Sequence, residues 1–158
     1  MELCDLTAFE MNRLLRAREV SAQEILASAL RRIEVVDGRP GTLEPGEITA
    51  EDRAKVHAFI TLTAERAQEQ AARVDARLAA GEDPGLLAGI PFTVKDIFCV
   101  KGTPSTAASK ILSRFVAPYT ATAIERLEAA GGLMLGKVNL DEFTYGSSNE
   151  SSAFQPSP

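Results

Sequence analysis

Apolar residues recur at helical spacing in the first part of the chain. Thr7 with Glu10, and Ser21 with Glu24, place a side-chain oxygen before each apolar stretch and a carboxylate three residues later, which is the pattern of a capping box. The sequence therefore predicts two short helices within residues 1–36. The apolar residues expected on their buried faces are Met11, Leu14 and Leu15 in the first helix and Leu26, Leu30 and Ile33 in the second.

Residues 37–53 break this pattern with two Gly-rich turns and two prolines, which predicts a surface loop. His57 to Leu62 has the short, apolar, β-rich character of a buried strand. A long helix is predicted from Thr63 to Ala80, and Gly81 supplies its stop signal. Its expected inner face keeps a 3,4,3,4 spacing of mostly small side chains: Ala64, Ala67, Ala71, Val74 and Leu78.

The second half of the chain alternates between strand and helix signals. The segment GIPFTVKDIFCV, residues 89–100, is a strand candidate, and a helix around 121–130 with Ile124 and Leu127 inward leads into the apolar segment LMLGKVN. Alternating strands and helices predict an α/β layer fold.

Composition and charge restrict the function. With 158 residues, 45% hydrophobic and 25% charged, the chain has the profile of a folded domain or a piece of one. With a net charge of −5, the chain is not expected to bind nucleic acid tightly by itself. No apolar run approaches the roughly 20 residues that span a bilayer, so we expect no membrane contact and a cytoplasmic location. Cys4 and Cys99 form no metal-binding or disulfide pattern.

Lys95 is the most unusual residue, because it interrupts the otherwise apolar stretch 90–100. If it is buried, desolvation favours its neutral amine, which can act as a general base for a serine. The alternative is that Lys95 forms an ion pair with Asp96 at the end of a strand.

Several standard catalytic and nucleotide-binding motifs are absent. No serine lies three residues before a lysine, and Gly146 to Glu150 is not a GxSxG nucleophile elbow. The sequence also lacks a Walker A loop and a GxGxxG motif. Phosphate chemistry is therefore not expected in this chain.

Two long segments, GIPFTVKDIFCVKGTPSTAAS and TATAIERLEAAGGLMLGKVNLDEFTYGSSNESSAF, resemble the amidase signature family in motif order and spacing. The second is similar to the glutamyl-tRNA(Gln) amidotransferase branch of that family. The resemblance runs from Leu87 to the end of the chain and is weaker over the N-terminal helices.

This resemblance implies the N-terminal part of the amidase signature fold, a mixed central sheet covered by helices. Residues 1–36 would be N-terminal helices, 37–53 an inserted loop, and 54–158 the first strands and helices of a single α/β domain. The insertion, 38–52, is longer than the turn usual there. The chain is expected to stop before the Gly/Ser-rich signature of the family.

The resemblance also implies a chemistry. In the family a lysine, a cis-peptide serine and a nucleophilic serine form the triad; Lys95 matches the lysine, and both serines are expected beyond Pro158. The full-length protein would hydrolyse glutamine to release ammonia. Partner subunits B and C would complete a heterotrimer that uses ATP and Mg²⁺ to convert Glu-tRNA(Gln) to Gln-tRNA(Gln). No cofactor is expected in this chain, and tRNA would bind only through the complex.

Other polar residues near these motifs have more local roles. Ser147 and Ser148 either shape the site or fix a turn by hydrogen bonding. Asp96 could likewise help to shape the site, or orient the local backbone or the Lys95 strand. Asn139 is expected to cap a helix at Asp141 and Glu142.

Two further functions stay open. The chain could come from a free-standing amidase without partners, or it could be a complete non-catalytic binding or assembly module. The first predicts no associated subunits, whereas the second predicts a cooperative monomeric fold for residues 1–158.

Overall fold

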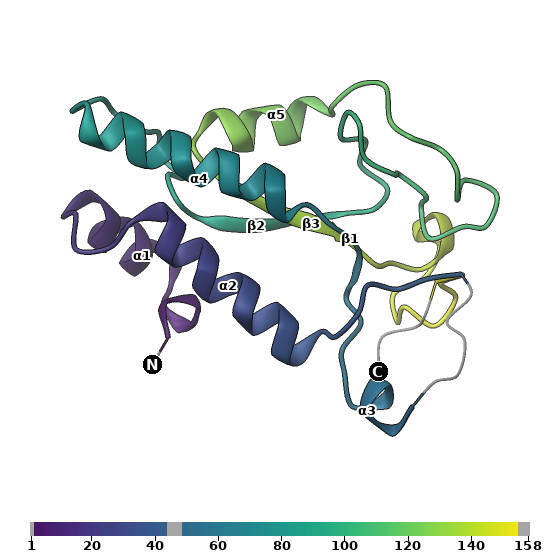
Figure 1. Ribbon diagram of the computed structural model, residues 1–158. Coiled ribbons are helices and arrows are strands. Elements are labelled where there is room, and N and C mark those ends of the chain that lie inside the picture. The colour runs from purple at the N-terminus through teal and green to yellow at the C-terminus, as the bar shows by residue number, and fades with distance from the viewer. Residues whose placement is uncertain (1, 44–48, 155–158) are drawn as a thin grey trace. The chain divides into compact units, whose positions relative to one another are not determined.

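The computed structural model describes residues 2–43 and 49–154 (Figure 1). The chain divides into two compact units. Unit 1 comprises residues 1–33, 63–92 and 123–135, and unit 2 comprises residues 34–62, 93–122 and 136–158. Each unit is described separately below.

The N-terminal helices of unit 1 form as the capping boxes predict. After a 3-10 turn at Leu3–Asp5, α1 spans Ala8–Arg16 and α2 spans Ala22–Val36. Thr7 with Glu10, and Ser21 with Glu24, exchange the reciprocal hydrogen bonds of a capping box. In α2 the predicted face is only partly right, because Leu30 and Ile33 are half-buried. The buried residues of α2 are Ala22, Ile25, Leu26, Ser28 and Ala29.

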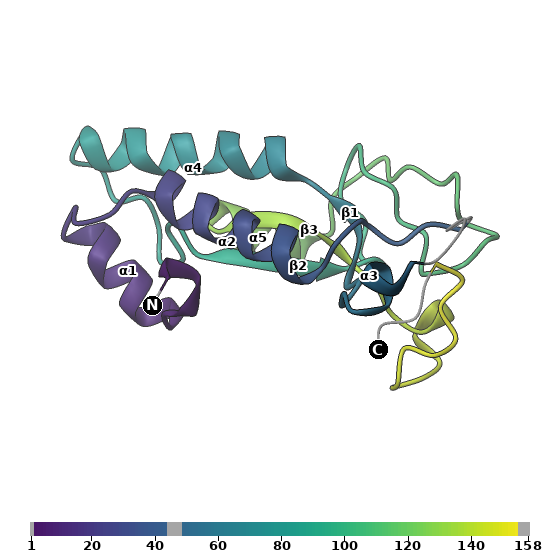
Figure 2. The same cartoon turned by 60° about the horizontal axis from the view of Figure 1, so that its bottom comes forward.

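Helices α4, Ala64–Ala79, and α5, Thr122–Ala129, lie close to their predicted positions. The small-residue face of α4 is confirmed in part: Ala67, Ala71 and Val74 are buried, whereas Ala64 and Leu78 at its ends are half-buried. Gly81 follows the helix at a φ of 76°. Helix α2 runs alongside α4 (Figures 1 and 2), where Asp75 accepts a hydrogen bond from the backbone of Ala22. The two helices line an apolar groove that includes Leu26 and Leu30.

Three strands form a mixed sheet in the order β1-β3-β2: Phe59–Leu62, Leu133–Val138 and Pro91–Lys95. Strand β1 is antiparallel to β3, with Thr61 opposite Lys137. Strand β2 is parallel to β3, because Leu133 bonds to Ile90 and Asp96 bonds to Val138, so that both numbers rise together. This arrangement confirms the predicted α/β class with a mixed sheet and helices.

Two strand boundaries were predicted wrongly. The strand expected from His57 begins at Phe59, because His57 has a φ of 52° that no strand accommodates. The strand expected over 89–100 ends at Lys95. Beyond it the chain turns, with the backbone N–H of Phe98 donating to the carbonyl of Lys95.

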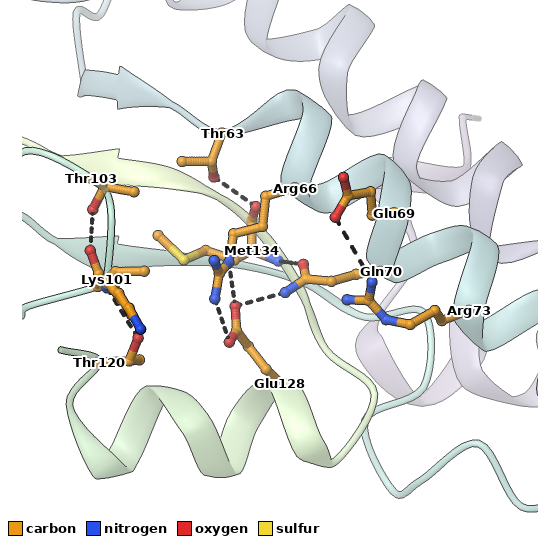
Figure 3. A network of polar contacts seen from close by, with 11 residues as sticks. Thr63, Arg66, Glu69, Gln70, Arg73, Lys101, Thr103, Thr120, Glu128 and Met134 are labelled. Carbon is orange, nitrogen blue, oxygen red and sulfur yellow. Dashed lines mark hydrogen bonds and ion pairs between the residues drawn. The ribbon is translucent and has the colours of Figure 1, made fainter. Parts of the chain in front are cut away.

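Side chains of α4 cover part of β3 in unit 1 (Figure 3). The Thr63 hydroxyl donates to the Met134 carbonyl at 2.9 Å, and the Met134 N–H donates to Gln70 Oε1 at 2.8 Å. Gln70 in turn donates to Glu128 of α5, which also accepts a bidentate pair of hydrogen bonds from Arg66. Thr63 and Gln70 thereby pair two backbone groups of Met134, beyond the point where β1 pairs with β3.

The segment predicted as a plain surface loop, 37–53, contains a short helix, α3, at Ala50–Arg53. Thr49 and Asp52 form its capping box. The buried ring of His57 lies against the carbonyl oxygens of Arg39 and Asp52, so this histidine is internal and hydrogen-bonded. Part of the predicted insertion, 44–48, lies outside the described residues.

Within the described ranges, the structure contains no helix that is both long and apolar enough to cross a membrane.

Candidate active site

Lys95 is the last residue of β2, and its side chain is exposed in this chain. From Thr93 to Asp96, across the end of β2, exposure alternates: Thr93 and Lys95 are exposed, whereas Val94 and Asp96, the residue after the strand, are buried. Successive side chains of a strand point to opposite faces, so Lys95 lies on the open face of the strand. The burial considered for Lys95 from the sequence is therefore not observed in the described residues. Apolar neighbours in the sequence did not reveal which face of β2 each side chain occupies.

Asp96 directly follows Lys95 and is completely buried. One carboxylate oxygen accepts from Lys137 Nζ at 2.8 Å, and the other accepts from the backbone N–H of Thr106 at 2.8 Å and from its hydroxyl. The backbone of Asp96 bonds to Val138 and Ala107. The alternative ion pair between Lys95 and Asp96 is wrong, because the partner of Asp96 is Lys137.

Lys137 lies in β3 and is the largest completely buried side chain of the described residues. Its ammonium donates to Asp96, to the Pro104 carbonyl at 2.9 Å and to Ser105 Oγ at 2.9 Å, so all three of its protons are used. Sequence reasoning missed this residue. The signal was a charge inside the apolar segment LMLGKVN, the same signal that pointed to Lys95.

The segment that receives this ion pair, 104–109, has an unusual backbone. Ala107 and Ala108 are buried and adopt positive φ values of 50° and 54°, a conformation that costs energy for residues with a Cβ. The Ala107 N–H donates to the Asp96 carbonyl, and its own carbonyl accepts from Phe143. The strained segment is thus tied to both the end of β2 and the region after β3.

The region after β3 folds around the carboxylate of Asp141, which is buried. The backbone N–H groups of Asn149 and Ser151 and the Ser151 hydroxyl donate to it at 2.9, 3.1 and 2.8 Å. These hydrogen bonds, that of Asn149 foremost, hold the pKa of Asp141 below its ordinary value.

The two serines proposed to shape the site lie in this same region. Ser147 and Ser148 are exposed, and the Ser148 hydroxyl donates to Glu150. The Ser148 hydrogen bond is of the kind that fixes a turn, and the site-shaping role of the two serines stays a prediction. Asn139 does not cap the following 3-10 turn, whose first residue is preceded by Asp141. Instead Asn139 Oδ1 accepts from Leu140 and Ser152.

A small apolar cluster packs beneath these segments in unit 2. Its buried members are Ile60, Ala108, Leu140 and Phe154. Among the residues that the structure describes, no group of three or more His, Cys, Asp or Glu side chains is arranged to hold a metal ion.

The sequence profile of the amidase family matches residues 49–158. Among curated relatives, the glutamyl-tRNA(Gln) amidotransferase A subunit of Nostoc punctiforme is 51% identical over 92% of this chain. Its counterpart from Moorella thermoacetica is 46% identical over 99% of it. The chain spans 27% and 29% of the lengths of these two relatives.

Solved structures agree with the sequence match. A vestigial protein complex linked to the origins of an s-triazine catabolic enzyme contains a chain that is 32% identical, with a TM-score of 0.83 over 96% of this chain and 30% of that one. Peptide amidase from Stenotrophomonas maltophilia is 26% identical, with a TM-score of 0.69 over 96% of this chain and 27% of that one. With most of its residues matched in sequence and in fold, the chain belongs to the amidase signature family.

Proposed function

We propose that Lys95 is the general base of an amide-hydrolysing triad whose two serines lie outside the described residues, after Pro158. The observation that carries this proposal is the position of Lys95: it ends β2, faces the open side of the strand and directly precedes Asp96, which forms a buried ion pair. Its ammonium is not engaged by Asp96, because that carboxylate pairs with Lys137. The Lys95 amine therefore stays available for a partner on the open face.

The proposed chemistry follows from that placement. The neutral Lys95 amine accepts the proton of a bridging serine, which accepts the proton of the nucleophilic serine as its oxygen attacks the amide carbonyl. The proton returns from Lys95 through the bridging serine to the amide nitrogen as the C–N bond breaks, so that ammonia leaves, and water then hydrolyses the resulting ester and restores the serine. Desolvation of Lys95, which favours the neutral amine, is proposed to come from parts of the full-length protein that cover the open face of β2.

For the full-length protein we propose the glutaminase role of an amidotransferase. Glutamine would be hydrolysed through a glutamyl-serine ester, and the ammonia would reach partner subunits B and C. There, ATP and Mg²⁺ would activate the glutamate of Glu-tRNA(Gln) for amidation. The identities of 51% and 46% to amidotransferase relatives support this assignment over a free-standing amidase, since peptide amidase is 26% identical.

The competing functions make different predictions. A free-standing amidase would purify alone and hydrolyse small amides without ATP or tRNA. A non-catalytic module would retain all its binding properties after loss of Lys95. Co-purification of the full-length protein with two further subunits, together with glutamine-dependent ammonia release, would exclude both.

The test uses the full-length protein with its partner subunits. We expect Lys95→Ala to lower glutamine-dependent ammonia release by about 10²–10⁴-fold, the range for loss of a general base, while the protein remains folded. The matched control is Lys101→Ala, because Lys101 is an exposed lysine six residues away in sequence. Near-normal turnover by Lys95→Ala would remove Lys95 from the mechanism.

A further inference from the structure

In unit 2, Asp96, the residue directly after Lys95, forms a buried ion pair with Lys137. Asp96 and Lys137 both have completely buried side chains, at a separation of 2.8 Å. Buried pairs are often no more stabilising than apolar residues of the same volume, because both charges lose their hydration. The backbone and side chains that the pair holds in place therefore indicate its role.

The pair fixes the backbone on both sides of the strand end. Asp96 is bound through its N–H, its carbonyl and both carboxylate oxygens to Val138, Ala107, Thr106 and Lys137. Because Asp96 directly follows Lys95 and its N–H donates to the Val138 carbonyl of β3, fixing Asp96 also restrains the backbone from which the Lys95 side chain extends.

Lys137 extends this restraint to the strained segment. Its ammonium also binds the Pro104 carbonyl and Ser105 Oγ, immediately before the left-handed Ala107 and Ala108. A strained backbone persists only where its surroundings over-determine it. The Asp96–Lys137 ion pair, together with the hydrogen bonds from Thr106 to Asp96, supplies that restraint. The end of β2 and segment 104–109 are thus linked by the contacts of Asp96 and Lys137.

The pair is also electrically neutral as a unit. Removing either partner leaves a buried charge close in sequence to Lys95, negative if Lys137 is lost and positive if Asp96 is lost. A negative charge favours the protonated form of a nearby lysine, and a positive charge favours the neutral form.

We propose that Asp96 and Lys137 are positioning residues for the catalytic reaction: together they hold Lys95 in the geometry and the electrostatic surroundings needed for proton transfer. This inference rests on the proposed role of Lys95. It assigns a function to Lys137, which the sequence marked only as a charge in an apolar segment, and gives Asp96 a defined partner.

The test measures kcat and KM for glutamine, per folded molecule, in the full-length protein with its partner subunits. We expect Lys137→Met to lower kcat by about 100-fold, the scale of a small misplacement of a catalytic group, while KM changes by less than about threefold. Ser105→Ala removes one contact of Lys137 and no charge, so we expect a loss of about three- to tenfold. If Lys137→Met does not fold, Ser105→Ala tests the same positioning role.

The pH profile separates positioning from simple stabilisation. With Lys95 as the base, kcat/KM rises with pH on its acid limb; we expect this limb to move to higher pH in Lys137→Met and to lower pH in Asp96→Asn. The matched control is Arg66→Met, which breaks an ion pair with Glu128 in unit 1 and should keep kcat within about twofold.

The outcomes distinguish this inference from the proposed function. If Lys95→Ala is inactive but Asp96→Asn, Lys137→Met and Ser105→Ala keep wild-type kcat per folded molecule, the positioning role is overturned and the role of Lys95 stands. If Lys95→Ala keeps wild-type turnover, both the proposed role of Lys95 and the positioning role are overturned. A loss of kcat with opposite shifts of the acid limb in Asp96→Asn and Lys137→Met supports the inference.

Discussion

Strand β3 is protected in different ways along its two halves. In unit 2, residues 136–138 pair with β1, and the strand carries Lys137 in a fully buried ion pair with Asp96. In unit 1, residues 133–135 are covered by Thr63 and Gln70, beside an ion pair between Arg66 and Glu128. The side chains of the second pair are 34% and 16% exposed, against 0% for both in the first.

The difference shows why two ion pairs of similar geometry should not be given the same role. The Arg66–Glu128 pair is partly exposed to water. Its Glu128 also accepts a hydrogen bond from Gln70, which pairs the Met134 N–H of β3. The Asp96 pair has no access to water, lies beside strained backbone and adjoins the proposed catalytic lysine. Because that pair is buried, loss of either partner would leave the other charge without a counter-charge and without water.

The largest expected effect on stability comes from breaking the buried pair. Lys137→Met should lower the free energy of unfolding by about 3–5 kcal/mol, because it leaves the Asp96 carboxylate buried without a counter-charge. Urea unfolding of the full-length protein would measure this. A loss below about 1 kcal/mol would mean that water reaches Asp96 and that the two pairs are alike.

The next effect concerns the contact between β1 and β3. A Cβ on Gly136 would lie 2.3 Å from the carbonyl oxygen of Thr61, and backbone cannot move aside cheaply. Gly136→Ala should therefore cost about 3 kcal/mol, the upper part of the range for overpacking. The same unfolding measurement applies, with Gly81→Ala as the comparison; no atom lies within 4 Å of the position a Cβ would take there. Because Gly81 has a φ of 76°, its cost comes from backbone strain alone.

A smaller effect is expected where helix side chains protect the strand. Gln70→Leu removes the acceptor for the buried Met134 N–H and should cost about 2 kcal/mol. Arg66→Met in the half-exposed pair should cost about 1 kcal/mol or less. Equal losses for Arg66→Met and Lys137→Met would contradict the distinction between the two halves of β3.

The smallest effect is a local response to acid in the region after β3. The pKa of Asp141 is lowered from 3.8 by the N–H groups of Asn149 and Ser151, so its contribution to stability is complete above that value and is lost as pH falls through the lowered pKa. Amide hydrogen exchange at Asn149 and Ser151 should accelerate only below about pH 4, beyond its intrinsic pH dependence. In Asp141→Asn this additional acid response should be absent.

Local signals in the sequence predicted much of the fold. The capping boxes at Thr7 and Ser21 located α1 and α2, and the small-residue spacing from Ala67 to Val74 located the inner face of α4. These features depend on residues three or four positions apart. A capping box or a helix face is therefore visible before any tertiary contact is known.

The site depended on contacts that sequence spacing does not contain. The exposure of Lys95 and the burial of Lys137 were not distinguished, because both residues interrupt apolar segments and only the pairing of strands decides which is enclosed. The left-handed backbone at Ala107 and Ala108 has no signature, since alanine favours other conformations. The family resemblance located Lys95, and the structure supplied its neighbours.

If Lys95 serves the glutamine-hydrolysing step, as we propose, a change of nitrogen source separates that step from the amidation that follows it. In the full-length complex, Lys95→Ala should lose amidation of Glu-tRNA(Gln) with glutamine by about 10²–10⁴-fold. It should keep wild-type amidation when ammonium chloride replaces glutamine, because the partner subunits then receive ammonia directly. Equal activity of Lys95→Ala and wild type with glutamine would contradict the proposed role of Lys95.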